Sequence, residues 1–241
     1  MLRCVIAKSD IGMTLDVLGA KSLMEPAVLT ISSRTYSSWS LRGWLLCRLA
    51  GIEIEEKMIS IDDPANRAEL LLLSPSVMVP RLTHESASVW DTLAIAEYLN
   101  ELYPQAQMYP ADRVARAHCR SICGEIHSGF ANLRSALPMN LRAEPRRHPI
   151  FTGAKPDIAR IETIWSECLA GYGGPYLFGA APTVADAMFA PVTRRFLTYG
   201  VEMTPASAAY CATISAWPPM AEWVAAAALE PEELDALDLD Y

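Results

Sequence analysis

The chain has 241 residues, of which 51% are hydrophobic and 20% are charged, a composition typical of a folded globular protein. Acidic residues outnumber basic ones by 28 to 20, and the formal net charge at pH 7 is -8. No basic block adjoins an aromatic cluster, so nucleic acid is not expected as a partner. The longest apolar runs, such as Leu70 to Leu73, are far shorter than the roughly 20 residues of a bilayer span, so no membrane association is expected.

Cysteine usage indicates a protein with reduced thiols. The six cysteines include no CxxC pair and are too few to suggest a disulfide framework, which favours a cytoplasmic location. Cys119 and Cys123 lie four residues apart near His118 and His127, but no second ligand cluster accompanies them. Because cysteine is commonly a small buried hydrophobe, no metal is expected. Residues 1–27 lack the apolar region of a secretory signal and are interpreted as a loosely ordered N-terminal extension.

The first half of the chain alternates strand and helix patterns. A buried strand is expected at Val28 to Ser32, followed by a polar turn and a helix. An alternating segment at Ile52 to Ile61 predicts a second strand, and Pro64 opens a short helix. Two strands around Val79 to Leu82 and Ser88 to Trp90, followed by an amphipathic helix, complete the order βαβαββα.

From Asp112 onward, every periodic segment is helical. Apolar side chains at helical spacing predict a long helix from Ile122 to Leu137, a second from Ile158 to Leu169 and a last one from Met220 to Ala227. The fold class is therefore α/β plus all-α. The predicted divisions are an extension (1–27), an α/β domain (28–103), a linker (104–111), an all-helical domain (112–229) and an acidic, solvated tail (230–241).

Four stretches resemble the cytosolic glutathione S-transferase family, in which a thioredoxin-like domain precedes a helical bundle. They are Tyr36-Ser37-Ser38-Trp39-Ser40-Leu41-Arg42, Ser74-Pro75 with Val79-Pro80-Arg81-Leu82, Trp90 to Leu99, and Phe178-Gly179 with Thr183 to Ala187. The first is similar to the SS-x-S-x-R turn of the zeta-type members, and the run from Glu125 to Phe130 resembles a bacterial subgroup. Four motifs in the right order are far more specific than one short motif.

The resemblance implies that glutathione is the co-substrate and that a hydroxyl stabilises its thiolate. Glutathione reacts only as the thiolate, so the protein has to lower the pKa of its thiol. A hydroxyl at a helix N-terminus, where the dipole favours negative charge, can do this. Ser37 is the preferred stabiliser, Ser38 is second and Tyr36 is a weaker rival. In the competing interpretation, these serines only cap the helix.

The resemblance also indicates which residues would bind the cysteinyl backbone and the γ-glutamyl end of glutathione. A cis bond between Val79 and Pro80 would leave the Val79 backbone exposed for pairing with the cysteinyl unit. Asp91 would face the γ-glutamyl ammonium, and Thr92 would offer its hydroxyl and N–H to the carboxylate at a helix N-terminus. In the competing interpretation, Asp91 merely caps the helix and Thr92 points outward.

The glycyl carboxylate needs a different partner from the usual one. Met78 occupies the place where the family commonly has Lys or Gln, and a thioether donates no hydrogen bond. Arg81 is therefore a candidate for binding glutathione, with Arg34 and Arg67 as further candidates.

The sequence also predicts residues that line the binding site of the second substrate, and it predicts one structural motif. The residues expected to line the electrophile pocket are Tyr36, Trp39, His127, Phe130 and Arg134, with Met139 beside them. Thr183 and Asp186 fit a capping box, and loss of the Asp186 side chain should cost about 1 kcal/mol or somewhat more and impair folding.

The leading hypothesis is a glutathione transferase that activates the thiolate for attack on an electrophilic, largely apolar small molecule. One alternative is a glutathione-dependent cis-trans isomerase of a maleylacetoacetate-like enone, although Trp39 stands where zeta-type members have Cys. Another is a noncatalytic ligand-binding protein of the same fold. Serine in place of cysteine argues against a glutaredoxin-like reductase. The resemblance further implies a homodimer.

Overall fold

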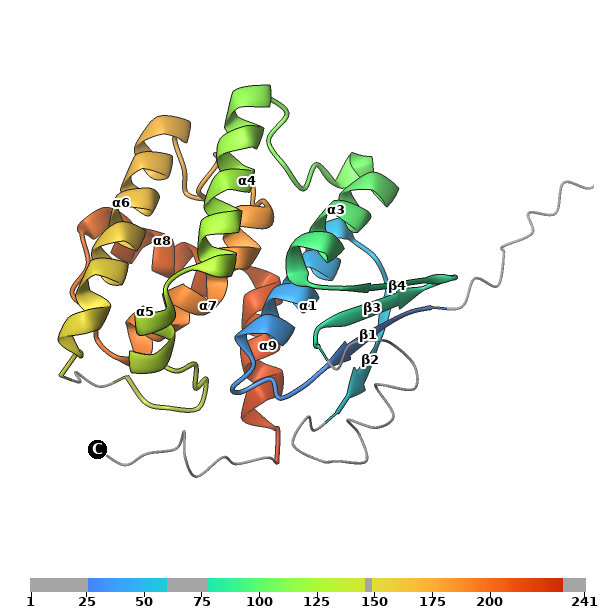
Figure 1. Ribbon diagram of the computed structural model, residues 1–241, viewed down its shortest axis with the longest axis horizontal. Coiled ribbons are helices and arrows are strands. Elements are labelled where there is room, and N and C mark those ends of the chain that lie inside the picture. The colour runs from blue at the N-terminus through green and yellow to red at the C-terminus, as the bar shows by residue number, and fades with distance from the viewer. Residues whose placement is uncertain (1–25, 60–77, 146–148, 232–241) are drawn as a thin grey trace, which may run out of the picture.

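The computed structural model describes residues 26–59, 78–145 and 149–231. In these ranges a four-stranded sheet and two helices are followed by helices alone (Figure 1). The predicted fold class, α/β plus all-α, is confirmed. The helix expected after Pro64, the Ser74-Pro75 motif and the extension up to residue 25 lie outside the described residues. The domain boundaries given above stay predictions.

The sheet has the order β2-β1-β3-β4. β1 lies parallel to β2 and antiparallel to β3, and β3 is antiparallel to β4. Leu29 and Leu82 are register partners and both are fully buried. Because successive side chains of a strand point to opposite faces, Arg81 faces away from this apolar layer. The strand bounds are Ala27–Ile31 for β1, Ile54–Met58 for β2, Arg81–His84 for β3 and Ala87–Trp90 for β4.

Helix α1 (Ser38–Ala50) connects β1 to β2 and packs on the sheet. It ends at Gly51, whose φ of 74° lies in the left-handed region that glycine adopts without strain. A Cβ on Gly43 would lie 2.5 Å from the Cβ of Pro80. Only glycine therefore allows α1 to approach the Val79–Pro80 turn this closely.

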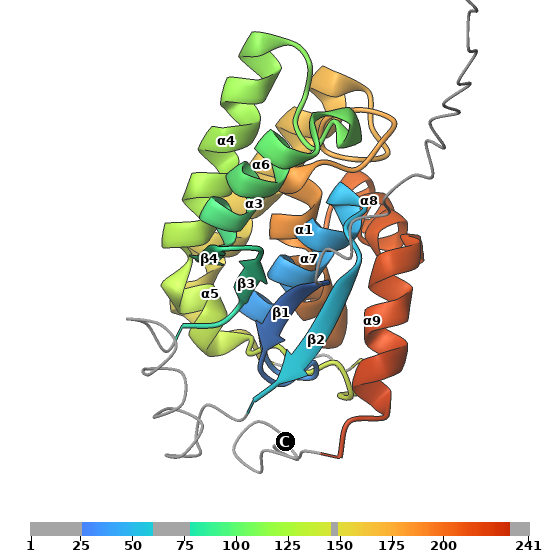
Figure 2. The same cartoon turned by 90° about the vertical axis from the view of Figure 1, so that its right-hand side faces the viewer.

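Helices α7 and α9 pack against α1 and helix α4 packs against α3, while α5, α6 and α8 lie farther from the sheet (Figures 1 and 2). Helix α7 packs against α1, α4 and α8, and most of its residues are buried, so it forms the centre of the helical region. The remaining helices have these bounds: α3 Thr92–Leu102, α4 Arg113–Ser128, α5 Ala131–Ala136, α6 Lys155–Tyr172, α7 Val184–Thr198, α8 Pro205–Ala216 and α9 Pro218–Ala228, with short 3-10 turns η1 at Pro104–Ala106 and η2 at Thr152–Ala154.

The prediction of a single long helix from Ile122 to Leu137 is wrong. The structure divides it into α4 and α5, because Gly129 has an extended backbone and Phe130 has a φ of 63°. The apolar spacing continues across the break because both helices turn their apolar side chains into the same core. Helix α8 was not predicted, because it is built mainly of small residues and shows little apolar periodicity.

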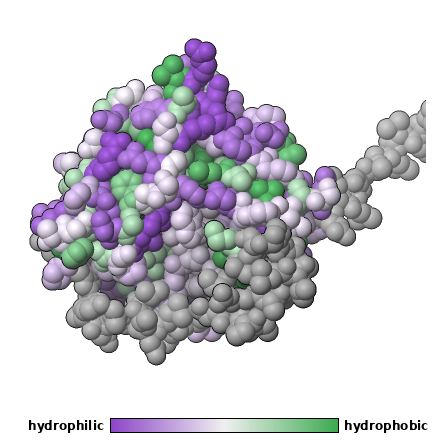
Figure 3. Space-filling view, in the orientation of Figure 1, coloured by the Kyte–Doolittle hydropathy of each residue, from purple (hydrophilic) through white to green (hydrophobic). Residues whose placement is uncertain are grey.

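One hydrophobic core runs from the sheet through α1 and α3 into the helical region. On the face in Figure 3, hydrophilic residues are interspersed with smaller hydrophobic areas. Within the described ranges, no helix combines the length and the apolar character that crossing a bilayer requires. Glu230, expected in a solvated tail, is instead buried at the end of α9 with only 8% of its surface exposed, because it finds hydrogen-bond donors in the β1–α1 turn.

Candidate active site

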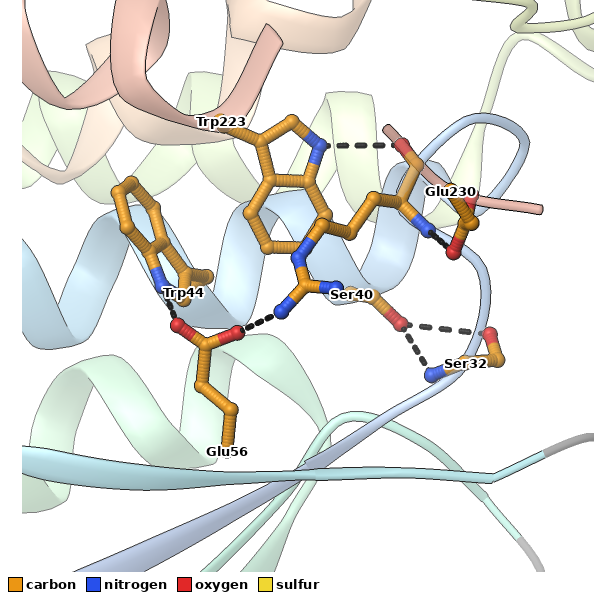
Figure 4. A network of polar contacts seen from close by, with 7 residues as sticks. Ser32, Ser40, Trp44, Glu56, Trp223 and Glu230 are labelled. Carbon is orange, nitrogen blue, oxygen red and sulfur yellow. Dashed lines mark hydrogen bonds and ion pairs between the residues drawn. The ribbon is translucent and has the colours of Figure 1, made fainter. Parts of the chain in front are cut away.

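The turn between β1 and α1 carries a cluster of serine hydroxyls. Ser37 is the N-cap of α1: its Oγ accepts a hydrogen bond from the Ser40 N–H at 3.2 Å and donates one to Ser40 Oγ at 2.9 Å. Ser40 Oγ also accepts from the Ser32 N–H at 3.0 Å and lies 3.3 Å from Ser32 Oγ (Figure 4). Since Ser40 Oγ keeps the Ser32 donor, the Ser37 hydroxyl proton can turn to another acceptor without leaving Ser40 unpaired.

Two further features adjoin this turn or the helix that follows it. Ser38 follows Ser37 directly and is buried, with 6% of its surface exposed. The Val79–Pro80 peptide bond is cis, as expected, and Pro80 packs against α1 at Gly43. β3 begins only at Arg81, later than the sequence predicted, because Val79 and Pro80 form the turn that precedes it.

Asp91 starts α3 in a conformation that is rare for a non-glycine residue. Its φ is 77° and its ψ is 131°, and such strain persists only where surrounding contacts impose it. Its Oδ1 accepts from the Leu93 N–H at 2.8 Å, and its Oδ2 lies 3.0 Å from Nε2 of His127 on α4. Nδ1 of the same imidazole lies 3.4 Å from Oγ1 of the buried Thr92. His127 therefore bridges α4 to the N-terminus of α3.

Trp39, in the first turn of α1, is surrounded by cationic and aromatic groups. The ring of His127 meets it edge-on at 5.1 Å between centroids. The guanidinium carbons of Arg42 and Arg134 lie 4.7 and 4.9 Å from the centre of the indole ring. Burial, followed by the neighbouring charges of Arg134 and Arg195, lowers the pKa of Arg42. These guanidinium groups favour an anion beside the serine turn.

The models of two domains of one protein family match the chain over the elements just described. The glutathione S-transferase N-terminal domain matches residues 36–102, and the glutathione S-transferase C-terminal domain matches residues 122–226. The chain belongs to the glutathione S-transferase family. The N-terminal match includes the serine turn, the Val79–Pro80 turn and α3. The protein is thus a glutathione S-transferase, an enzyme with glutathione as its co-substrate.

Individual relatives of this glutathione S-transferase are distant. A probable maleylacetoacetate isomerase of Caenorhabditis elegans is 25% identical over 174 residues, which cover 71% of this chain and 79% of the relative. Glutathione S-transferase 1 of Dianthus caryophyllus is 26% identical over 185 residues, covering 76% and 84% of the two chains. The crystal structure of a glutathione transferase homolog from Burkholderia GL BGR1, with bound glutathione, has a TM-score of 0.67 at 22% identity. The match covers 86% of this chain and all of that one. At that identity, the likeness establishes the fold.

The transferase fold brings most of the predicted site residues together. Trp39 and His127 are in contact, and His127 also reaches Asp91 and Thr92, so the serine turn and the N-terminus of α3 face one region. Arg134 joins it through Trp39. Their roles toward glutathione and the electrophile stay predictions.

Two of the residues predicted for the electrophile pocket lie differently from the others. Phe130 is buried in the core, where it precedes α5. Tyr36 lies in the turn with an intermediate exposure, and its N–H donates to Ser33 Oγ at 3.2 Å.

The candidates for the glycyl carboxylate have different environments. Arg34 is paired with Glu56 through an ion pair, so its charge is already neutralised. Arg67 lies outside the described residues. Arg81 is 96% buried, and within the described part of the chain its Nε and Nη1 have no hydrogen-bond partner. Met78 is 60% exposed.

The five cysteines of the described ranges are buried, where thiols do not react readily. Burial raises the pKa of the Cys47 and Cys168 thiols to about 12, so they stay protonated near neutral pH and are poor nucleophiles and ligands. Across residues 26–59, 78–145 and 149–231, no group of three His, Cys, Asp or Glu side chains is arranged to hold a metal ion.

Sequence reasoning missed two residues near the serine turn. Arg42 was part of the matched motif without a role, and the structure shows its Nε donating to the Met188 carbonyl of α7 at 2.8 Å. Glu230 was assigned to the tail, although its carboxylate binds the turn that leads to Ser37. No local pattern marks Glu230, because its partners lie about two hundred residues earlier in the chain.

Proposed function

We propose that this glutathione S-transferase uses the Ser37 hydroxyl to stabilise the glutathione thiolate for attack on an electrophilic, largely apolar small molecule. The observation that carries the proposal is the position of Ser37 Oγ at the N-terminus of α1, with a proton that can be redirected. Ser38 is the second candidate for this role. The enzyme is proposed to act as a cytoplasmic homodimer in detoxification.

Thiolate stabilisation follows from three contributions of the chain. The Ser37 O–H would donate to the sulfur in place of Ser40 Oγ, while the N-terminus of α1 supplies a positive dipole end. Arg42 and Arg134, whose guanidinium groups both lie against the Trp39 ring, add a positive field. The thiol proton leaves to solvent. Each of the three contributions lowers the pKa of the glutathione thiol, and none of these protein groups acts as the nucleophile.

The rest of glutathione would extend from the serine turn toward α3. The Val79 backbone would pair with the cysteinyl unit, as an added strand pairs with a sheet edge. Thr92 would bind the γ-glutamyl carboxylate, and Asp91 would bind the γ-glutamyl ammonium. Arg81 is proposed for the glycyl carboxylate, because two of its buried nitrogens have no partner in the described part of the chain.

The electrophile would lie against Trp39, with Tyr36, His127 and Arg134 around it and Phe130 behind. In conjugation, the thiolate forms a carbon–sulfur bond as the leaving group departs with its electron pair. In the competing isomerisation of a cis-enone, the thiolate adds, the carbon–carbon bond rotates and the sulfur leaves again. The likeness to a probable maleylacetoacetate isomerase favours the second reaction, whereas Trp39 in place of the zeta-type Cys favours the first.

Titration of the purified protein with glutathione tests the proposal. The thiolate absorbs in the ultraviolet, and we expect the pKa of the bound thiol to fall by about three units below that of free glutathione. Glutathione that binds with an unchanged thiol pKa would support the noncatalytic ligand-binding alternative. If no binding occurs, the proposal is wrong.

Replacing Asp91 with asparagine tests the γ-glutamyl contact. Asparagine tolerates the positive φ and keeps an oxygen for the Leu93 N–H, so the start of α3 should persist. The lost charge should raise the KM for glutathione about tenfold and leave kcat nearly unchanged, since a hydrogen bond to a charged group contributes roughly 1.5–3 kcal/mol. Steady-state kinetics checks this result. A loss confined to kcat would place Asp91 at the reacting sulfur instead.

A further inference from the structure

Glu230, which follows the C-terminal end of α9, binds the turn between β1 and α1. Its carboxylate accepts hydrogen bonds from Ser33 Oγ at 2.8 Å, from the Arg34 N–H at 2.8 Å and from the Thr35 N–H at 2.9 Å. Two backbone donors and one hydroxyl thus converge on a single buried carboxylate. Hydrogen bonds to an ionised acceptor are about twice as strong as neutral ones.

The bonds made by Ser33 continue to the proposed catalytic hydroxyl. Ser33 Oγ, which donates to Glu230, accepts from the Thr35 N–H at 3.1 Å and the Tyr36 N–H at 3.2 Å. The Ser33 carbonyl accepts from the Ser37 N–H at 3.1 Å. One residue therefore links the Glu230 carboxylate to the backbone of Ser37, and the position of Ser33 sets the position of the cap.

Other contacts hold the same turn against α9 and β2. The indole N–H of Trp223 on α9 donates to the Arg34 carbonyl at 3.0 Å, and the Arg34 guanidinium pairs with Glu56 of β2, which also accepts from the Trp44 N–H at 2.8 Å (Figure 4). Thr35 Oγ1 donates to the Ala227 carbonyl at 3.3 Å. These bonds fix the flanks, whereas Glu230 binds the backbone N–H groups at the centre of the turn.

We propose that Glu230 is a positioning residue for thiolate activation. By holding the N–H groups of residues 34 and 35 and the Ser33 hydroxyl, it keeps Ser37 Oγ directed at the glutathione sulfur. The last residues of the helical region thus complete the active site of the α/β region. This inference rests on the proposed function.

The carboxylate is ionised throughout the range in which the enzyme can be assayed. Although burial opposes ionisation, the hydrogen bonds from the turn keep the pKa of Glu230 below its ordinary value. Of the charged groups nearby, the Arg34 guanidinium pairs with Glu56 of β2, and Arg142 Nε donates to the Ala227 carbonyl near the end of α9 at 3.3 Å. A pH dependence between about pH 6 and 9 therefore reports the glutathione thiol and not Glu230.

Glu230→Gln tests the proposal because the amide nitrogen would face N–H donors in place of an acceptor oxygen. We expect the pKa of bound glutathione to rise by about one unit, and kcat/KM to fall about tenfold at pH 6.5. The deficit should shrink toward pH 9, where the thiol ionises without help. A loss of the same size at every pH would indicate a merely structural role and overturn the proposal, as would an unchanged thiol pKa.

Glu222→Gln, on α9 itself, is the matched control. Glu222 forms an exposed ion pair with Arg48 Nη2 at 2.7 Å, joining α9 to α1 away from the turn, so its loss should leave the pH profile unchanged. If Glu230→Gln does not fold, Ser33→Ala removes the same link and must show the same pH-dependent deficit. Wild-type protein that fails to ionise glutathione would refute the proposed function itself. Wild-type ionisation with an unaffected Glu230→Gln or Ser33→Ala variant would refute only the role of Glu230.

Discussion

Replacing Ser37 with alanine should lower kcat/KM for glutathione conjugation by about 100-fold at pH 6.5. The variant loses the hydroxyl that caps α1 and that can turn its proton to the sulfur. Removal of a single preorganised donor to a developing or stabilised anion typically costs about 10²–10³ in rate. The pKa of bound glutathione, followed by ultraviolet absorbance, should rise by about two units at the same time.

The structure also provides the controls for Ser37→Ala. Ser37 caps α1, so the variant should lose about 1 kcal/mol of stability through the missing cap, and the folded fraction has to be measured by circular dichroism. Ser37→Thr keeps both the cap and the hydroxyl and should retain most of the activity. Ser38→Ala should have a much smaller effect. If Ser38→Ala instead abolishes thiolate formation while Ser37→Ala does not, the two serines exchange roles.

A gain-of-function variant tests the same position independently. Ser37→Cys would place a protein thiol next to the glutathione sulfur. Its thiolate can attack a disulfide substrate, releasing one thiol and leaving a mixed disulfide that glutathione then reduces. Disulfide reductase activity with glutathione as the reductant should therefore rise above that of the wild type. No rise would contradict the assignment of Ser37 to the sulfur.

Features whose determinants lie within a few residues of one another could be predicted from the sequence. Gly51 ends α1 in the left-handed region, and Asp91 caps α3. The capping box of Thr183 and Asp186 is also present at the start of α7. In each case the side chain and the backbone group that it satisfies are close neighbours in the chain, so the motif contains the whole interaction.

Apolar periodicity did not predict the break between α4 and α5, because tertiary packing determines the backbone conformation there. The apolar side chains recur at helical spacing from Ile122 to Leu137. The helix is nevertheless interrupted at Phe130, which is buried in the core and has a positive φ. Spacing reports which side chains are buried and carries no information on a break that keeps the same face inward. Helix α8 was missed because small residues fill most of its own positions and leave little apolar periodicity.

Long-range polar contacts could not be predicted at all. Arg42 reaches a carbonyl of α7, His127 reaches the start of α3, and Glu230 binds the β1–α1 turn. A charged residue in a polar sequence context is usually solvated, so Glu230 in an acidic stretch gives no sign of burial. Glu230 comes within hydrogen-bond distance of residues 33–35 only when the helical region has packed against the sheet, so these contacts cannot be inferred from the local sequence.

Asp186→Asn should destabilise the protein by about 2–4 kcal/mol, far more than loss of an ordinary helix cap. The carboxylate is fully buried and accepts from four donors: the Leu177 N–H and the Tyr210 hydroxyl, both at 3.1 Å, bind Oδ1, while the Thr183 N–H at 2.8 Å and hydroxyl at 3.0 Å bind Oδ2. Burial raises its pKa to about 6, so at pH 7.5 it is ionised and needs all of these donors. An asparagine amide would turn its own N–H groups toward two of them.

Urea unfolding at pH 7.5 measures the loss, and Asp157→Asn is the matched control. Asp157, in the first turn of α6, accepts one hydrogen bond, from the Leu133 N–H at 2.9 Å, and is only partly buried. Its replacement should therefore cost no more than about 1.5 kcal/mol. Folded Asp186→Asn protein should bind glutathione with wild-type affinity at low temperature, because none of the four donors belongs to the serine turn or to α3. Equal losses for the two variants would mean that the buried donors find water once the charge is gone, and that the Asp186 carboxylate is not what joins α7 to the preceding loop and to α8.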